Sequence, residues 1–195
     1  MRILLLLVTV LLLPLSANAA SHDSHRSEYA GEEHREIKSL SEADIDELRD
    51  GGGWGLALAA ELNGVPGPVH LLEMKKEIRL SPEQIGQIEA LFEQMRGQAI
   101  ELGTTLIDLE RELNSQFAEG TINEKLLRDL LEQIAQVRAQ LRFVHLSTHL
   151  KTPDILTTEQ IARYNELRGY SSDDPCTNIP AGHDPEMWKK HNNCP

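Results

Sequence analysis

The chain has 195 residues, about the length of one domain. It is acidic, with 31 Asp and Glu against 19 Lys and Arg, which argues against a nucleic-acid-binding protein because such a protein needs a basic face. Aromatic residues make up only 4% of the chain, which favours a slender helical protein over a thick α/β core. No nucleophile–base arrangement and no phosphate-binding glycine loop is visible in the sequence, so we do not expect an enzyme.

The first 19 residues have the features of a cleaved signal peptide. Arg2 supplies a positive start, residues 3–13 are apolar, and Ala17-Asn18-Ala19 is a small-residue cleavage site. The apolar run is short for a bilayer span, and no later segment is apolar enough to be one. We therefore expect an exported protein that does not span the membrane after cleavage.

The next part of the chain combines a polar arm with short helices. Residues 20–40 are polar and contain several histidines, which predicts a flexible arm. A short helix is predicted over residues 41–50, with Ser41 as its cap and Gly51-Gly52-Gly53 as its stop. Further short helices are expected over residues 54–62 and 69–79, so the helical domain is predicted to extend over residues 41–170.

Two long amphipathic segments dominate the pattern. From Ile85 to Leu113, apolar residues recur at alternating spacings of 3 and 4, which is a heptad seam. A second seam runs from Leu127 to Val144, and residues 117–120 separate the two. The pattern predicts an all-α fold, a long antiparallel helical hairpin with short flanking helices. Glycines outside the first seam would permit close approach of another segment: Gly86, Gly97 and Gly103.

Some apolar residues lie outside these seams, among them Leu91, Leu126 and Leu131. More than one face of the hairpin is therefore apolar. Either the short helices or a second copy of the chain would cover these residues, and a second copy makes the protein a homodimer. The same residues would serve as the contact surface of a protein that holds unfolded clients.

A short motif occurs twice, and each copy predicts the start of a helix. Residues 80–84 and 156–160 share the pattern Leu-Ser/Thr-x-Glu-Gln. In each copy the hydroxyl can accept a backbone N–H of the first turn, and the Gln can reach back to the cap, as in a capping box. The capping residues are Ser81, Gln84, Thr157 and Gln160.

The repeated motif resembles the LTxxQ signature of the Spy/CpxP family of periplasmic stress proteins, which includes ZraP and the CnrX metal-sensor domain. The resemblance covers about Leu80 to Tyr170. It implies a periplasmic, non-enzymatic stress-response protein that binds divalent metal, unfolded clients or both, as an ATP-independent chaperone-like protein. Two alternatives remain: a heavy-metal sensor that acts through a membrane-bound signalling partner, and a structural envelope protein with neither activity.

His145 and His149 are the first candidate metal ligands. Their i, i+4 spacing on a helix places both imidazoles on one face. In a hairpin that turns near residue 119, they lie opposite roughly residues 90–95 of the first long helix. The alternative is that both histidines only cap carbonyl groups or favour the helix C-terminus.

The CnrX resemblance implies a fuller ligand set. That domain binds its ion with a His pair before the first long helix, a Glu on that helix and a His-x-x-x-Met pair late in the second. In this chain the order differs: the His-x-x-x-Met pair comes before the first long helix, and a pair of histidines lies late in the second. Such ligands suit zinc, nickel, cobalt or copper, whose binding would tighten the open end of the hairpin and alter a client-facing or partner-facing surface. The corresponding residues here are His70, Met74, Glu89 or Glu93, His145 and His149.

The only cysteines, Cys176 and Cys194, lie in the C-terminal tail, residues 171–195. In an oxidising compartment such a pair is expected to form a disulfide. A loop of this size gains about 3 kcal/mol in the chain-entropy account. A zinc site that adds His183 and His191 is the alternative, although its spacing matches no familiar zinc finger.

Overall fold

The computed structural model describes residues 27–170, 176, 179, 182–192 and 194. Within these residues the chain is helical and contains no strand, which confirms the predicted all-α class. The chain divides into a small unit that ends at His34 and a larger unit that begins at Arg35. The small unit contains the 3-10 helix η1 (Glu32–His34). The predicted signal peptide lies outside the described residues.

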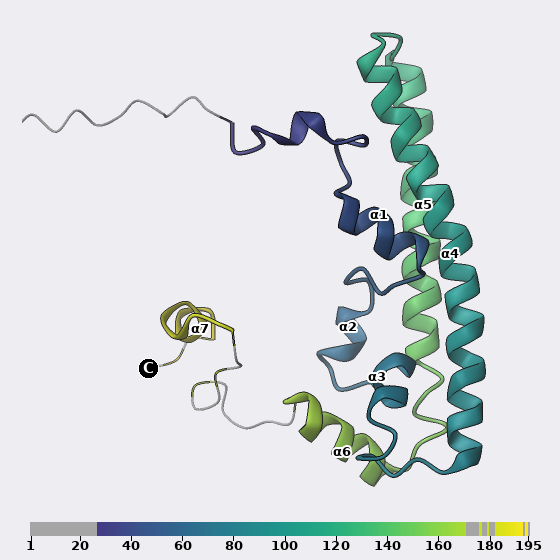
Figure 1. The fold of residues 1–195 in the computed structure, drawn as a ribbon, viewed down its shortest axis with the longest axis vertical. Coiled ribbons are helices and arrows are strands. Elements are labelled where there is room, and N and C mark those ends of the chain that lie inside the picture. Colours follow the sequence, from purple (N-terminus) through teal and green to yellow (C-terminus); the bar gives the residue numbers. More distant parts are fainter. Residues whose placement is uncertain (1–26, 171–175, 177–178, 180–181, 193, 195) are drawn as a thin grey trace, which may run out of the picture. The chain divides into compact units, whose positions relative to one another are not determined.

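The larger unit is built on an antiparallel hairpin of two long helices, α4 (Pro82–Ala118) and α5 (Glu124–His149) (Figure 1). The side chain of Ser81 accepts the first-turn N–H of α4, and the side chain of Asn123 does the same for α5. Between the helices, Gly120 has a φ of 67°, a left-handed conformation common where helices end. Both long helices and their turn are therefore confirmed.

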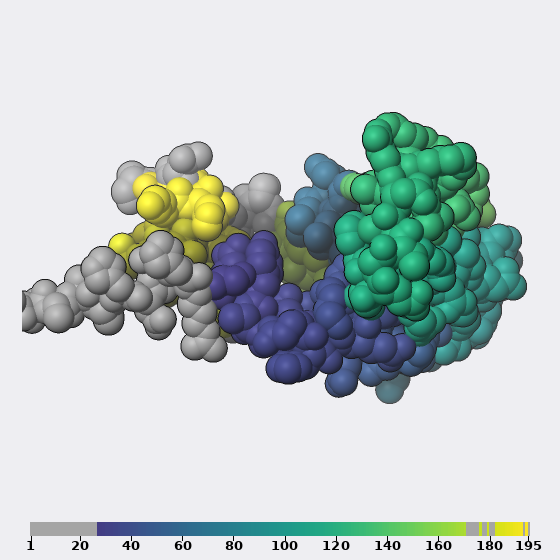
Figure 2. Space-filling view, turned by 90° about the horizontal axis from the view of Figure 1, so that it is seen from above, coloured from purple at the N-terminus to yellow at the C-terminus, as the bar shows by residue number. Residues whose placement is uncertain are grey.

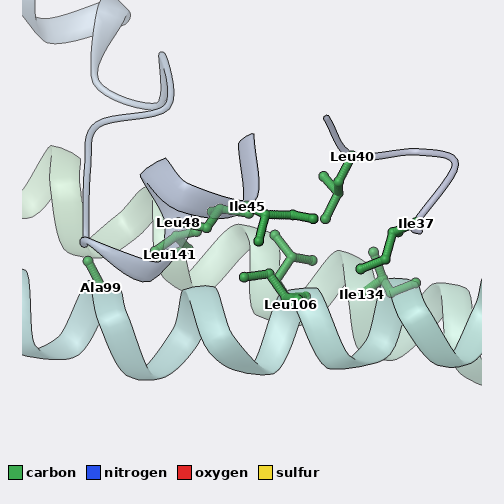
Figure 3. Packing of buried hydrophobic residues seen from close by; sticks show 9 residues of the cluster. Ile37, Leu40, Ile45, Leu48, Ala99, Leu106, Ile134 and Leu141 are labelled. Carbon is green, nitrogen blue, oxygen red and sulfur yellow. The ribbon is translucent and has the colours of Figure 1, made fainter. Parts of the chain in front are cut away.

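One apolar cluster packs α1 (Glu42–Arg49) onto the middle of the hairpin. Ile45 of α1 lies over Leu106 of α4, Leu48 lies beside Leu141 of α5, and Ile37 lies beside Ile134 of α5 (Figure 3). In the space-filling view, the blue segment that contains α1 lies along one side of the hairpin (Figure 2). This packing supplies partners for the seams that the hairpin alone would leave half covered.

The packed region extends to residues that the sequence assigned to the arm. Ile37 and Leu40 are only 0% and 2% exposed and belong to the same cluster. The Ser39 hydroxyl donates a hydrogen bond of 2.8 Å to the buried carboxylate of Glu110. Residues 37–40 are therefore attached to α4, because their apolar side chains have a partner there that local sequence does not reveal.

The backbone of α1 approaches α4 closely at Gly103. A Cβ atom at this position would lie 2.4 Å from the carbonyl oxygen of Leu48. By contrast, a Cβ at Gly86 or Gly97 would meet nothing within 4 Å. The expected close approach therefore occurs at one of the three glycines.

A second apolar cluster closes the open end of the hairpin. It joins α3 (Pro68–Glu73), the start of α4 and α6 (Thr158–Arg168). The short helix α2 (Leu58–Glu61) contacts α5. Both α2 and α3 are shorter than predicted, because turns with positive φ at Trp54 and Gly55 precede α2 and turns follow α3. The buried members of the cluster are Leu71, Ile78, Leu80, Ile88 and Tyr164.

The two LTxxQ-like motifs meet at this end. Each forms its predicted capping box at the start of α4 or α6. The Gln84 Nε2 donates to Gln160 Oε1 at 2.8 Å, and Gln160 Nε2 donates back to Gln84 Oε1 at 3.0 Å. The Nε2 of Gln84 also donates to the Ile155 carbonyl, and the Nε2 of Gln160 also donates to the Arg79 carbonyl. Each glutamine thus caps its own helix and binds the other motif.

In the tail, Cys176 and Cys194 form the predicted disulfide. The helix α7 (Pro185–His191) lies between them in the sequence and is capped by Asp184. The ring of His183 packs edge-on against Trp188, with ring centroids 4.8 Å apart. Most of residues 171–181 lie outside the described residues.

Candidate functional site: a histidine cavity

A cavity of about 430 Å³ lies between α2, α3, the loop after α1 and the two long helices. Pockets for small ligands typically begin at about 300 Å³. The apolar walls include Trp54, Leu58, Phe92 and Met95. The polar walls include three histidines and three carboxylates: His70, His145, His149, Glu47, Asp50 and Glu61.

His149 is held by the segment that leads into α3. Its Nδ1 lies 2.9 Å from the carbonyl oxygen of Val65, and since a carbonyl only accepts, Nδ1 carries the proton. A Cβ at Gly67 would lie 2.7 Å from Cε1 of the ring, so glycine is needed at this position. The hydroxyl of Thr152 donates to the Pro66 carbonyl at 2.6 Å, which holds the same segment on the end of α5.

His70 enters the cavity from α3. Its Nδ1 lies 2.7 Å from a carboxylate oxygen of Glu61, which also pairs with Arg168 at 3.5 Å. The carboxylate accepts, so Nδ1 of His70 carries a proton and donates, and Nε2 is the ring nitrogen left for another partner. The side chain is 29% exposed, so it lies nearer the cavity mouth than the other two histidines.

His145 is only 3% exposed, and its Nε2 atom has no hydrogen-bond partner among the described residues. Burial lowers the pKa of His145, the electrostatic interaction with His149 lowers it further, and the interaction with Glu47 opposes these effects. The ring is therefore neutral at pH 7. An unpartnered, buried imidazole nitrogen is uncommon, because most buried polar atoms have a hydrogen-bond partner.

A strained loop forms one side of the cavity. Trp54 has a φ of 43°, which is uncommon for a residue other than glycine. Its backbone N–H donates to Glu47 at 2.7 Å, its indole N–H donates to Asp44 at 2.8 Å, and the Arg138 guanidinium lies 4.8 Å from its ring centroid. The hydroxyl of Ser41 and the indole N–H lower the pKa of the Asp44 carboxyl.

The sequence predicts only a helix stop at Gly51-Gly52-Gly53, but all three glycines line the cavity. A Cβ at Gly51 would lie 2.9 Å from the backbone oxygen of Arg96, so the loop packs directly on α4. The signal available was a glycine run followed directly by Trp54, since a helix stop needs only one glycine.

The structure brings together only part of the ligand set that the resemblance implied. His70, His145 and His149 share the cavity, but Glu89 and Glu93 are exposed on α4 and do not line it. Glu89 and Glu93 each follow an inward-facing residue, Ile88 or Phe92. Because one residue turns a helix by about 100°, both carboxylates point away from the cavity. Met74 instead packs against the second apolar cluster.

The donor chemistry of the cavity fits a transition metal in part. Imidazole nitrogens and carboxylates are ligands for zinc, nickel, cobalt and copper. Among the described residues, however, no group of three or more His, Cys, Asp or Glu side chains is placed to hold a metal ion. The histidines share one cavity without converging on one point.

Comparison with known protein families gives one match to this chain. Residues 70–168, just over half of the chain, match the family described as LTXXQ motif family protein. Comparison with curated proteins and with solved structures finds no match. Members of the family are typically periplasmic and generally non-enzymatic. No helix in the described ranges is long and apolar enough to cross a membrane.

The matched region contains both capping motifs, the whole hairpin and all three cavity histidines. The chain belongs to the LTXXQ motif family, which is the Spy/CpxP-type family.

Proposed function

We propose that this protein is a non-enzymatic, periplasmic stress protein that binds a divalent transition metal in the histidine cavity. One observation carries the proposal: three histidines from α3 and α5 line one cavity, and Nε2 of buried His145 has no partner among the described residues. A purely structural histidine would be expected to use its polar atoms in hydrogen bonds.

The surroundings of the other two histidines support the same role. Metal-binding histidines usually donate the second ring N–H to a carboxylate or a backbone carbonyl, which orients the ring. His70 has this arrangement with Glu61, and His149 has it with the Val65 carbonyl. Carboxylates on the cavity wall add negative potential, which attracts cations.

His70, His145 and His149 would hold the ion through Nε2, with Met95 on the cavity wall as a softer donor. Because no three donors are already placed together in the described chain, binding requires side-chain rotation. His70 is the most exposed of the three and has the most freedom to rotate. A bound divalent ion would supply positive charge beside the cavity carboxylates.

Calorimetric titration of the exported, oxidised protein with zinc, nickel, cobalt and copper tests this proposal. Wild type is expected to bind one equivalent, and the His145→Gln/His149→Gln variant to bind at least tenfold more weakly. Glu61→Gln, which removes the carboxylate partner of His70, is expected to weaken binding by about 10- to 100-fold. His183→Gln/His191→Gln in the tail is the matched control.

Retention of wild-type affinity in the His145→Gln/His149→Gln variant would contradict the proposal. Loss of binding in the tail variant alone would place the ion in the tail. Circular dichroism and thermal unfolding of each variant would show whether a loss of affinity reflects a loss of fold.

A second candidate function is capture of apolar segments of unfolded proteins at the cavity mouth. Leu58 and Val69 line the cavity and are 50% and 37% exposed, and Leu62 beside them on the chain is 62% exposed. Exposed apolar side chains around a cavity with an apolar floor favour binding of a large apolar side chain. No nucleotide is needed for such capture.

An aggregation assay with an unrelated unfolding client tests the second function. Leu58→Ser/Leu62→Ser is expected to lose most of the protection that wild type gives. Met187→Ser, also 61% exposed but located in α7, is expected to retain it. Equal protection by the two variants would remove the cavity mouth as the client site.

A further inference from the structure

A groove lies between the C-terminal part of α4 and the segment that precedes α1. It has a volume of about 290 Å³, close to the size at which small-ligand pockets begin. None of its lining residues belongs to the histidine cavity, so the groove is a separate site. The lining residues are Lys38 and Ser39 of the segment and Glu110, Leu113, Asn114 and Phe117 of α4.

The wall of the groove opposite α4 is fixed by contacts with that helix. The side-chain amide of Asn114 donates to the Glu36 carbonyl at 3.3 Å, and its oxygen accepts the backbone N–H of Lys38 at 3.3 Å. Ile37 and Leu40, which are buried, point towards the hairpin on either side of the lining residues of this segment (Figure 3). The groove is therefore built from well-anchored backbone on both sides.

Glu110 places a buried carboxylate in the groove. The residue is only 6% exposed, and Oε2 accepts a hydrogen bond of 2.8 Å from the Ser39 hydroxyl, the carboxylate's only hydrogen bond within the described chain. The other oxygen, Oε1, lies 3.9 Å from Nη1 of Arg138, which is beyond hydrogen-bonding distance, and the same guanidinium lies over the ring of Trp54. A buried charge is stable only when it is well paired, so Oε1 favours a further cationic donor.

The other walls suit a cation that is carried on an apolar stem. Leu113 is half-buried, and Phe117 is 58% exposed, so both offer apolar contact to an alkyl chain in the groove. The face of an aromatic ring also attracts a nearby cation. Lys38 lines the same groove, but its ammonium donates to the carbonyl of Arg35 and not to Glu110.

The hydrogen bonding of Glu110 favours an ammonium over a guanidinium. A guanidinium binds a carboxylate best through two parallel hydrogen bonds, one to each oxygen. Here Oε2 already accepts from Ser39, so only Oε1 is left for such a partner. An ammonium is a compact charge that needs one oxygen, and the net charge of −12 on the chain adds a general attraction for cations.

We propose that this groove binds a primary alkylammonium group. Its ammonium donates to Oε1 of Glu110, and its alkyl stem lies along Leu113 and Phe117. A free alkylamine and a lysine side chain of another protein both offer this group. The groove shares no residue with the histidine cavity, so the proposal does not depend on metal binding.

A titration followed by ¹H–¹⁵N NMR tests the proposal on the whole exported, oxidised protein. The probes are n-hexylammonium chloride and Nα-acetyl-lysine amide, which represent the two sources of the group. Wild type is expected to show saturable shifts of the Ser39, Glu110 and Asn114 amide signals with one or both probes. Tighter binding of the first assigns the groove to free amines, and tighter binding of the second assigns it to lysine side chains of a partner.

Three variants examine the contacts. Glu110→Gln keeps the shape of the side chain but removes its charge, and is expected to weaken binding by about 10- to 100-fold. Phe117→Ser is expected to weaken binding by about 2- to 5-fold, the contribution of an exposed cation–π contact. Glu101→Gln is the matched control, since it removes the same charge from an exposed position of α4 outside the groove and is expected to leave binding unchanged.

The neutral analogue n-hexanol separates charge recognition from apolar contact. Circular dichroism and urea unfolding of each variant show whether the fold is kept, and Phe117→Ser is expected to keep it because this side chain is exposed. Absence of saturable shifts with both ammonium probes would overturn the proposal. Wild-type affinity in a folded Glu110→Gln variant, or equal binding of n-hexanol and n-hexylammonium, would also overturn it.

Discussion

The reciprocal hydrogen bonds between Gln84 and Gln160 make a quantitative prediction about the repeated motif. Each side chain caps its own helix, donates to the other glutamine and donates to a carbonyl of the other motif's segment. Because the pair is partly buried, water replaces these bonds poorly. We therefore expect the two residues to stabilise the open end of the hairpin as a unit.

Substitution of either residue measures this effect. A net hydrogen bond contributes about 0.5–1.5 kcal/mol, so Gln84→Ala, which removes four such bonds, is expected to lower the free energy of unfolding by about 2–6 kcal/mol. Gln160→Ala is expected to cost a similar amount. The double variant loses the two hydrogen bonds between Gln84 and Gln160 only once, so the coupling energy is expected to be about 1–3 kcal/mol.

Urea denaturation of wild type, both single variants and the double variant completes this cycle. Gln87→Ala is the matched control, since Gln87 is exposed on the same helix and its side chain makes no hydrogen bond among the described residues. Additive single effects, with a coupling energy below about 0.5 kcal/mol, would refute the reasoning. The motifs would then be separate helix caps that happen to lie close together.

Three further predictions concern glycine contacts and a buried histidine. Gly103→Ala is expected to lower stability by about 1–3 kcal/mol through its clash with the α1 backbone, whereas Gly97→Ala, with open space around it, is expected to raise stability by up to about 1 kcal/mol in urea melts. Because the pKa of His145 is lowered in the folded state, the unfolded chain binds more protons, so stability is fully present above about pH 6.5 and falls as pH drops below it. His145→Gln is expected to reduce this fall between pH 7 and 5.5, and an unchanged pH profile would contradict it. Gly67→Ala is expected to displace the ring of His149 and weaken metal binding at least tenfold by calorimetry, and unchanged affinity would contradict that contact.

The fold was largely predictable because its signals are local. Heptad spacing and the capping residues Ser81 and Thr157 depend only on neighbours in the sequence. They predicted the positions of α4, α5 and α6 in the chain. The attachment of Ile37 and Leu40 was not predictable in this way. Their partners lie about 70 residues away on α4, and no periodicity over four residues can reveal such a contact.

The site was predictable only where ligands share one helix. The i, i+4 spacing places His145 and His149 together whatever the tertiary structure, and both reach the cavity. The position of Glu61, the carboxylate that pairs with His70, instead depends on the path of the chain through the turn before α3. Glu89 and Glu93 were predicted from the hairpin register alone. The register predicts which residues of α4 lie at the same height as His145 and His149, but not which of them face the cavity.

Histidine side-chain NMR with zinc is the most direct measurement of the central claim. Long-range ¹H–¹⁵N spectra distinguish Nδ1 from Nε2 and show which nitrogen carries the proton. The account predicts that His149 and His70 carry the proton on Nδ1 before zinc is added. With zinc, the Nε2 signals of His70, His145 and His149 are predicted to shift together with one equivalent bound. Unchanged cavity signals, or shifts confined to His183 and His191, would contradict a metal site in the histidine cavity.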